Sequence, residues 1–226
     1  MVKIHVIIPA SGSGKRFNTD RPKQFEKIHG KSIISLTESK FAQVDLVDKI
    51  FLIGDRAHEK DFLQEKFHSK TKVIYAAGKE RAQTVLNALK YLMDIEKINT
   101  NDWIIVHDAV RPNISANLIT SFIDKISQSD IGGIMAVRES DTVKMVDEKF
   151  EIQKTISRTN LWRAQTPQMF KADLLLDGFV NFVGNPTDES EVIENLNLKP
   201  IIFEGDSRNI KITYPEDLDL LEKEMR

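Results

Sequence analysis

The chain has 226 residues, of which 41% are hydrophobic and 29% charged, a balance typical of a folded globular domain. Its formal net charge of −2 argues against nonspecific nucleic-acid binding as the main activity, so any phosphate site must be a local cluster of cations. The absence of cysteine excludes disulfides, thiolate catalysis and cysteine-based zinc sites. No apolar run is long enough to span a membrane and no signal peptide is evident, so we expect a cytoplasmic protein.

A buried strand followed by a cationic loop opens the sequence. Residues 2–8 are an apolar run rich in β-branched side chains, which predicts a first strand that ends at Pro9. The loop that follows is made of small residues with free backbone N–H groups, and three cations lie in or just after it: Lys15, Arg16 and Lys23. Backbone donors and cations after a first strand favour a binding site for phosphates.

Two well-known glycine motifs do not fit this loop. A Walker loop has glycine five residues before its Gly-Lys pair and Ser or Thr after it, whereas this chain has Pro9 and Arg16 in those places. The dinucleotide-binding fingerprint needs a third glycine where this chain has Phe17. An ordinary strand-to-helix turn remains the alternative, and the three cations weigh against it.

Strands and helices alternate through the next hundred residues, which predicts an α/β fold with a doubly wound, mostly parallel, Rossmann-like sheet. The expected strands are residues 49–54, 72–76, 103–107 and 131–137. The expected helices are residues 32–43 with Ser32 as N-cap, 57–67, a strongly amphipathic segment around 82–93, and 115–127.

Two turns at the expected carboxyl ends of strands carry polar candidates. Gly78 and the residues up to Thr84, Arg81 among them, follow one strand where doubly wound sheets bind ligands, although from the residues alone a routine first helical turn is the favoured explanation of Arg81 and Thr84. Asp108 follows another strand, where a carboxylate can hold Mg²⁺ together with substrate phosphates. A helix cap or a turn is the alternative for Asp108.

The pattern changes after residue 140. Residues 141–147 and 150–156 alternate polar and apolar side chains and predict a β-hairpin inserted into the α/β fold. Arg158 then offers a bidentate clamp for a phosphate, with a solvated surface arginine as the alternative. Helices are expected at 171–183 and 216–226, and a further one begins near Thr187 or Asp188, with Glu191 completing a capping box to Asp188. Short strands are expected at 199–203 and 209–213, the second carrying Lys211.

Several of these segments together resemble a known family. Residues 9–16 (Pro-Ala-Ser-Gly-Ser-Gly-Lys-Arg) followed by 21–25 (Arg-Pro-Lys-Gln-Phe) resemble the signature of sugar-phosphate nucleotidyltransferases, in the Pro-Lys-Gln form of their cytidylyltransferase branch. Residues 107–112 (His-Asp-Ala-Val-Arg-Pro) resemble the magnesium motif of that branch. The Arg-x-x-Leu-Trp-x-Ala-x-Thr-Pro-Gln spacing of 158–168 narrows the resemblance to the 2-C-methyl-D-erythritol 4-phosphate cytidylyltransferase family.

The resemblance implies an enzyme that transfers the cytidylyl group of CTP to 2-C-methyl-D-erythritol 4-phosphate and releases pyrophosphate. It implies a single nucleotidyltransferase domain over residues 1–226 and a homodimer held by an arm at about 138–158. It assigns catalysis to Arg16, Lys23 and Lys211, and CTP binding to Ala10, Ser11, Gly12, Gly14, Gly78, Arg81 and Thr84. It assigns Mg²⁺ to Asp108, and further substrate contacts to Asp108, Arg111, Arg158 and Thr187, with small-molecule substrates and neither nucleic acid nor membrane as partners.

Two positions depart from the usual pattern of the family. Ser11 stands where alanine is commoner, and residues 77–80 read Ala-Gly-Lys-Glu where Gly-Gly-Asp/Glu is commoner. Lys79 could therefore change the contacts that this segment makes with the ribose. Ribitol 5-phosphate cytidylyltransferase, with the same chemistry and a different polyol, is the nearest rival. A noncatalytic nucleotide-binding regulator on the same fold is the rival of another class, and a full set of cations around an aspartate speaks against it.

Overall fold

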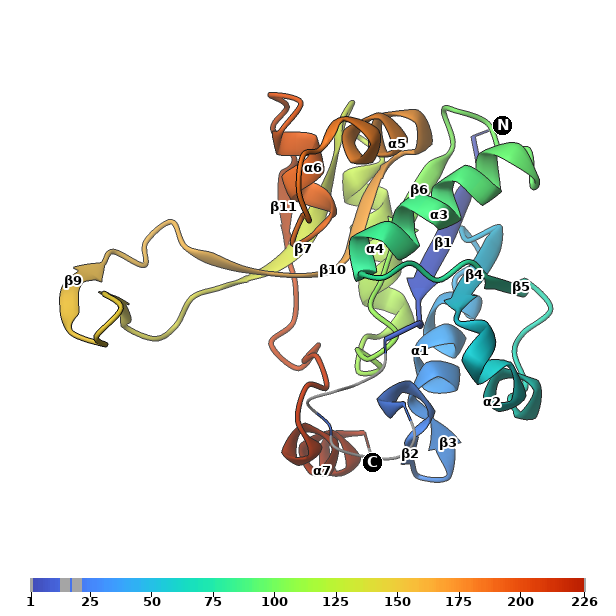
Figure 1. Ribbon diagram of the computed structural model, residues 1–226, viewed down its shortest axis with the longest axis horizontal. Helices are drawn as coiled ribbons and strands as arrows, with labels where there is room; N and C mark the ends of the chain where they lie inside the picture. The colour runs from blue at the N-terminus through green and yellow to red at the C-terminus, as the bar shows by residue number, and fades with distance from the viewer. Residues whose placement is uncertain (1, 13–16, 18–21, 226) are drawn as a thin grey trace.

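The structure is a computed structural model that describes residues 2–12, 17 and 22–225. A seven-stranded sheet forms its centre, in the order β11-β7-β10-β6-β1-β4-β5 (Figure 1). Neighbouring strands run parallel except for β10, which is antiparallel to both β6 and β7. The strands are β1 (Ile4–Pro9), β4 (Lys49–Gly54), β5 (Thr71–Tyr75), β6 (Trp103–Val106), β7 (Gly132–Arg138), β10 (Trp162–Lys171) and β11 (Ile201–Glu204). The predicted mostly parallel α/β sheet is confirmed.

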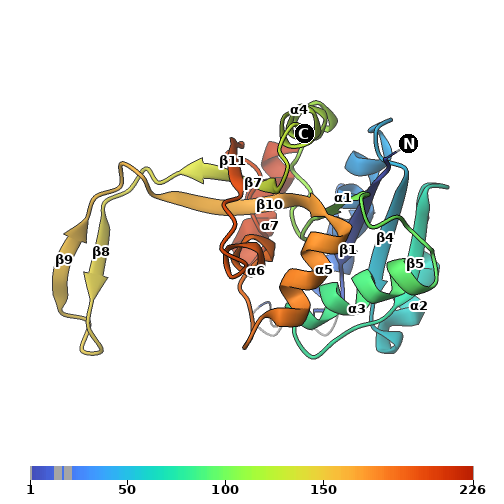
Figure 2. The same cartoon turned by 90° about the horizontal axis from the view of Figure 1, so that it is seen from above.

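Helices cover both faces of the sheet (Figures 1 and 2). Alternate residues of a strand point to opposite faces, and in β1 Val6 and Ile8 pack into one core cluster while Ile7 packs into the other. The first cluster also holds side chains of α1, α2 and α4, and the second holds side chains of α3, α5 and α6. The helices are α1 (Ile33–Ala42), α2 (Glu59–Gln64), α3 (Arg81–Asp94), α4 (Ala116–Ile126), α5 (Ala172–Asn181), α6 (Glu189–Glu194) and α7 (Pro215–Glu224).

Local capping signals set several helix starts as predicted. Ser32 accepts a hydrogen bond from the backbone N–H of Ser35 and begins α1, and Ser115 accepts one from Leu118 and begins α4. The helix expected at 57–67 is shorter: a 3₁₀ turn, η2 (Arg56–His58), precedes α2, and the chain leaves the helix at Glu65. It turns there because the backbone N–H of His68 donates to the buried Glu38 carboxylate on α1, at 3.0 Å.

Other expectations are corrected in the last third of the chain. Residues 209–213 are not a strand, because the N–H of Ile212 donates to the carbonyl of Val110 and the Asn209 side chain donates to the carbonyl of Thr166. The capping box at α6 is only half formed. Asp188 accepts the N–H of Glu191 as predicted, but the Glu191 carboxylate bonds to Thr187.

The predicted hairpin is present as β8 (Val143–Val146) and β9 (Ile152–Ile156), which, among the strands of the described residues, pair only with each other. It projects away from the sheet at the end of β7 and the start of β10, so both connections run side by side (Figures 1 and 2). Its apolar side chains are open to solvent: Phe150 is 86% exposed and Ile152 64%.

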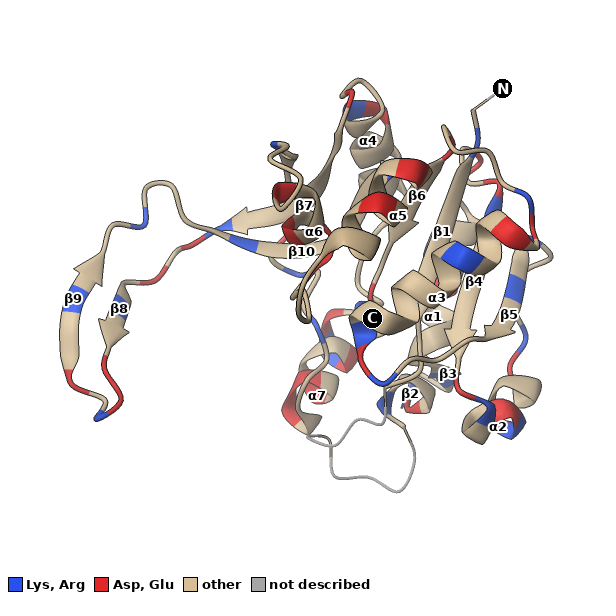
Figure 3. Cartoon of the chain, turned by 45° about the horizontal axis from the view of Figure 1, so that its top comes forward, with Lys and Arg blue, Asp and Glu red and all other residues tan. Residues whose placement is uncertain are grey.

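The parallel pairing of β4 and β6 with β1 brings three strand ends to the same edge of the sheet. The residues that follow them, Ala10, Asp55 and Asp108, therefore share one region, as expected for a ligand site in a doubly wound fold. The short segments η1 (Lys23–Phe25), β2 (Lys27–Ile28) and β3 (Lys31–Ser32) lead from there into α1. Lysines, arginines and acidic residues are interspersed along the described part of the chain (Figure 3). No helix among the described residues is both long enough and apolar enough to cross a bilayer.

Candidate active site

A cleft of about 640 Å³ opens at the carboxyl edge of the sheet. Most of the residues proposed from the sequence for catalysis and CTP binding line it: Ala10, Ser11, Gly12, Lys23, Gly78, Arg81, Asp108 and Lys211. They come from segments up to 200 positions apart, so the cleft is a product of the tertiary fold. Two further candidates, Gly14 and Arg16, lie outside the described residues.

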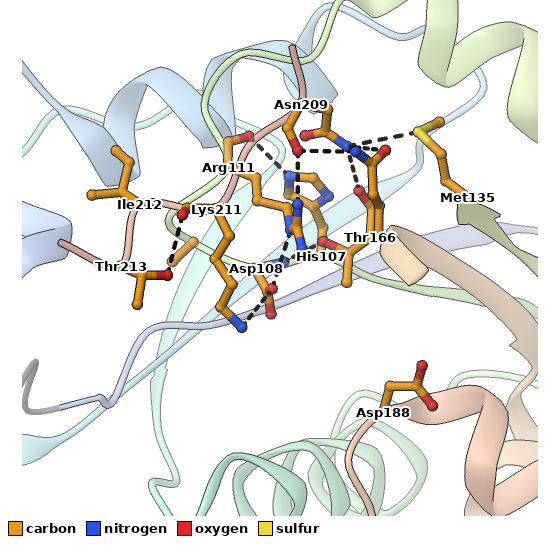
Figure 4. Close-up of polar contacts among 12 residues, drawn as sticks. His107, Asp108, Arg111, Met135, Thr166, Asp188, Asn209, Lys211, Ile212 and Thr213 are labelled. Carbon is orange, nitrogen blue, oxygen red and sulfur yellow. Dashed lines mark hydrogen bonds and ion pairs between the residues drawn. The ribbon is translucent and has the colours of Figure 1, made fainter. Parts of the chain in front are cut away.

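Asp108 is the centre of the charged groups in the cleft (Figure 4). Its Oδ1 accepts from Arg81 Nε at 2.9 Å, and its Oδ2 lies 3.0 Å from Lys211 Nζ and 3.3 Å from Arg111 Nε. Burial of Asp108 disfavours its ionised form, but the charges of these three cations outweigh burial and hold the pKa of the carboxyl well below its usual range. Asp108 is therefore an anion throughout the physiological pH range.

The guanidinium of Arg81 joins Asp108 to a second carboxylate. Its Nη1 and Nη2 donate to the two oxygens of Glu189, at 2.7 and 3.0 Å, while its Nε holds Asp108. Burial disfavours the charge of Arg81, but Glu189 and Asp108 outweigh it and raise the pKa of the guanidinium. The Glu189 side chain is completely buried, and burial raises the pKa of its carboxyl against the opposing charge of Arg81.

The backbone of Asp108 is held from β10 and from its own turn. Its N–H donates to Thr166 Oγ1 at 3.0 Å, and Nε2 of the neighbouring His107 donates to the carbonyl of Arg111 at 3.1 Å. Burial lowers the pKa of His107 to about 4, so its imidazole is neutral. These contacts agree with a structural role for His107. Arg111 does not line the cleft, and it donates to the carbonyl of Asn209 at 2.7 Å besides holding Asp108.

The loop after β1 is tied to the rest of the cleft by side chains. Gln24, which is buried, donates to the carbonyl oxygens of Ala10 at 2.8 Å and Gly12 at 3.2 Å. The hydroxyls of Ser11 and Thr84 lie 3.0 Å apart, and Thr84 also accepts the N–H of Gly78 at 3.0 Å. Thr84 thus holds the two glycine turns of the cleft against each other, although it does not line the cleft itself.

Two further sequence candidates neither line the cleft nor hydrogen-bond to the described residues that line it. Arg158 is exposed at the base of the arm, where it donates to the carbonyl of Ser140. Thr187 is exposed just before α6 and bonds to Glu191. Neither is brought to Asp108 within this chain.

Sequence reasoning missed two residues that organise the site. Gln24 belongs to the Pro-Lys-Gln segment, and that motif was the only signal of its importance. Glu189 had no signal of its own, because an acidic residue in the first turn of a helix is common. Only the fold shows it facing Arg81 from 108 positions away.

The mostly parallel sheet, the loop at the end of β1 and the cations gathered around one aspartate in a shared cleft together define a nucleotidyltransferase. The family model of 2-C-methyl-D-erythritol 4-phosphate cytidylyltransferase matches residues 4–226, and the chain belongs to this family. It is therefore an enzyme of the cytidylyltransferase class.

Individual relatives agree with this assignment over their whole length. The chain is 36% identical to the 2-C-methyl-D-erythritol 4-phosphate cytidylyltransferase of Nitrosomonas eutropha, over 100% of this chain and 98% of that protein. It is 37% identical to the enzyme of the same name from Hahella chejuensis, over 97% and 92%. The crystal structure of the Francisella tularensis enzyme matches with a TM-score of 0.82 at 36% identity, covering 98% of this chain and 99% of that one.

Proposed function

We propose that this enzyme transfers the cytidylyl group of CTP to 2-C-methyl-D-erythritol 4-phosphate, forming 4-diphosphocytidyl-2-C-methyl-D-erythritol and pyrophosphate in non-mevalonate isoprenoid biosynthesis. The observation that carries the proposal is the convergence of Lys23, Lys211 and Arg81 on the cleft that contains Asp108. Among the described residues four cations line the cleft, Lys23, Lys79, Arg81 and Lys211, against the three carboxylates Asp55, Glu80 and Asp108, and this local cluster of cations fits a triphosphate. The family assignment favours methylerythritol phosphate over ribitol phosphate as acceptor.

The reaction needs positioning and charge neutralisation more than acid–base chemistry. A phosphate oxygen of the polyol substrate attacks the α-phosphorus of CTP in line with the leaving pyrophosphate, so no covalent enzyme intermediate is required. Lys23 and Lys211 neutralise the charge that builds on the α-phosphate oxygens, together with Arg16, whose structure is not described. The neutral, buried His107 takes no part in proton transfer.

We assign the nucleotide to the cleft between the loop after β1 and the start of α3. Backbone N–H groups of Ser11 and Gly12 hold its phosphates, together with Gly14 from the part of the loop that the structure does not describe. Ala10 lines the cleft, but its own N–H donates to the carbonyl of Ile53 at 2.8 Å. The segment from Gly78 through Arg81 to Thr84 holds the cytosine and ribose of the nucleotide. No atom of the described residues lies within 4 Å of the place where a side chain on Gly12 would begin, so this part of the chain leaves space for a ligand there.

Asp108 is the residue that would hold Mg²⁺ between the phosphates. Among the described residues no three His, Asp or Glu side chains gather into a group that could hold a metal ion, so a cation at Asp108 would need further ligands from substrate and water. That suits Mg²⁺, which binds one or two carboxylates and completes its shell with waters and substrate phosphates. When bound, Mg²⁺ would supply charge stabilisation to the phosphoryl oxygens. Arg111 bonds to Asp108 and does not line the cleft, so we assign it to holding the Asp108 carboxylate rather than to binding substrate.

The exposed arm favours a homodimer in which Arg158 binds substrate in the active site of the partner subunit. We propose one nucleotidyltransferase domain over residues 1–226, from which residues 138–158 project as the dimerisation arm. The exposed apolar side chains of β8 and β9 would be covered by a second copy. Arg158 and Thr187 would then hold the phosphate of the polyol from two different subunits. The enzyme would work in the cytoplasm, where CTP is made.

The direct test is release of pyrophosphate by the purified enzyme with CTP and Mg²⁺. We expect release with 2-C-methyl-D-erythritol 4-phosphate and little with ribitol 5-phosphate. A preference for ribitol 5-phosphate would overturn the acceptor, and tight CTP binding without release on either polyol would favour a noncatalytic regulator.

A further inference from the structure

Glu189 is a buried carboxylate to which the proposed chemistry assigns no role. Its side chain is 0% exposed, and both oxygens are used by one partner, the Arg81 fork. Burying the Glu189 carboxylate carries a desolvation cost that a pair of apolar side chains in the same place would avoid, so stability alone does not account for this ion pair. Arg81 is also hydrogen-bonded to Asp108, so the role of the Glu189–Arg81 pair is to be sought at that aspartate.

The backbone on either side of Glu189 is fixed to the sheet by Gln168. Its Nε2 donates to Asp188 Oδ2 at 3.0 Å, and its Oε1 accepts from the N–H of Ser190 at 2.9 Å. Gln168 lies on β10 opposite Val106, the last residue of the strand that leads to Asp108. Thr166, two residues earlier, accepts the N–H of Asp108. One short piece of β10 therefore fixes the backbone at Glu189 and at Asp108, the two carboxylates that Arg81 joins.

All the cations around Asp108 compete with any metal for its oxygens. Each oxygen is occupied, Oδ1 by Arg81 and Oδ2 by Lys211 and Arg111. Arg111 has a second anchor in the carbonyl of Asn209, and Arg81 has one in Glu189. An arginine with a second anion shares its charge between the two carboxylates and keeps its place when one of them turns away.

We propose that Glu189 is a positioning residue for the transfer reaction: it anchors Arg81, so that Asp108 can release Arg81 and accept a metal–nucleotide complex. This inference rests on the proposed function. Without the Glu189 charge, Asp108 would be the only carboxylate bonded to Arg81 within the described structure, and the arginine would hold it more firmly. The cleft would also carry one more positive charge, which favours a metal-free triphosphate.

The test is calorimetric titration of CTP into the protein, once with EDTA and once with Mg²⁺. For Glu189→Gln we expect metal-free affinity to be kept or increased, while the gain in affinity on adding Mg²⁺ shrinks by about tenfold relative to wild type, the size of coupling common between residues in contact. The control is Glu194→Gln, which makes the same charge change on the exposed side of α6 and should behave as wild type.

A purely structural role predicts a different pattern. Damage to the fold would lower metal-free and metal-supported affinity together, and this result would overturn the proposal, as would an unchanged gain with Mg²⁺ in Glu189→Gln. Should that variant not fold, Glu189→Asp keeps the charge on a shorter side chain. It should reduce the gain with Mg²⁺ by a smaller factor, and wild-type behaviour there would also overturn the proposal. A wild-type protein that binds CTP but transfers nothing would refute the proposed function and leave this comparison intact.

Discussion

The ammonium group of Lys23 donates a hydrogen bond of 2.7 Å to the carbonyl oxygen of Ile212, a residue 189 positions later in the chain. Ile212 follows Lys211 directly, so this bond fixes two of the proposed catalytic cations relative to each other. The fold thereby joins the end of the first loop to the segment before α7.

We predict that Lys23→Ala lowers turnover by ~10²–10³, with a much smaller loss of CTP affinity. This is the effect expected when one preorganised donor to developing charge is removed. Steady-state kinetics with calorimetry of CTP binding measures both quantities. Lys27→Ala, four residues further on and exposed, is the control and should keep full turnover. Turnover of Lys23→Ala within a few-fold of wild type would remove Lys23 from the catalytic set.

The arm gives a second prediction. Deletion of residues 141–154 should yield a folded, monomeric and nearly inactive protein, because these residues carry the exposed apolar side chains of β8 and β9 and form no part of the main sheet. Light scattering measures the mass, and circular dichroism checks the fold. Lys149→Ala, a change of exposed charge in the hairpin turn, should leave the dimer intact. If the deletion variant were still a dimer, the assembly would rest on another surface.

Arg158 and Asp108 should fail in different ways. Arg158→Ala should raise the KM for the polyol phosphate strongly and leave CTP binding nearly intact, since a charge-assisted clamp stabilises only the group it touches. Asp108→Asn should instead weaken CTP binding in the presence of Mg²⁺ and lower turnover. Calorimetry that showed CTP binding lost in the Arg158 variant and kept in the Asp108 variant would make both assignments wrong.

Mixing these two impaired variants, at a polyol phosphate concentration far below the raised KM of Arg158→Ala, tests whether Arg158 acts across the dimer. After equal amounts have exchanged subunits, half of the dimers combine one of each, and one site in each such dimer then has both Asp108 and a partner's Arg158. Activity should return to about a quarter of the wild-type value per subunit, as expected for a two-fold symmetric dimer. Arg158 acting within its own subunit would leave the mixture as inactive as its components.

His5 predicts a pH dependence of stability that does not involve the active site. It is 2% exposed on β1, against the ring of Phe51 and between Asp48 and Asp102, whose carboxylate oxygens lie 3.7 and 3.5 Å from its ring nitrogens. Burial lowers the pKa of His5 from its ordinary 6.5, with a smaller contribution from Lys3, and outweighs the opposing attraction of the two aspartates. The unfolded chain therefore binds this proton more tightly than the folded chain does.

The contribution of neutral His5 to the free energy of unfolding should accordingly be fully present above about pH 6.5, and it should be lost as the pH falls through the lower pKa of the folded state. Urea unfolding between about pH 7.5 and 5 measures it, and a His5→Gln variant should show a flatter profile than wild type. His68→Gln, at an exposed histidine, should keep the wild-type slope. Equal slopes for His5→Gln and wild type would contradict the prediction.

The sequence by itself determined the local elements and the chemical character of the site. The strands β1 and β4, and the helices capped by Ser32 and Ser115, follow from side-chain periodicity and capping within a few residues, interactions that depend little on the rest of the chain. The motifs around Lys23 and Asp108 predicted a phosphate site, and the fold brings these two residues and Lys211 into one cleft.

Only the tertiary structure decided the features that join distant segments. Strand β10 (Trp162–Lys171) pairs antiparallel with both β6 and β7, and nothing in its own residues predicts these neighbours. Residues 209–213 are irregular because their hydrogen-bond partners are the carbonyl groups of Val110 and Thr166. Glu189 reaches Arg81 across 108 positions for the same reason. Strand neighbours and buried ion pairs depend on which segments the whole core brings into contact, and that information is spread over the chain rather than held in any one stretch of it.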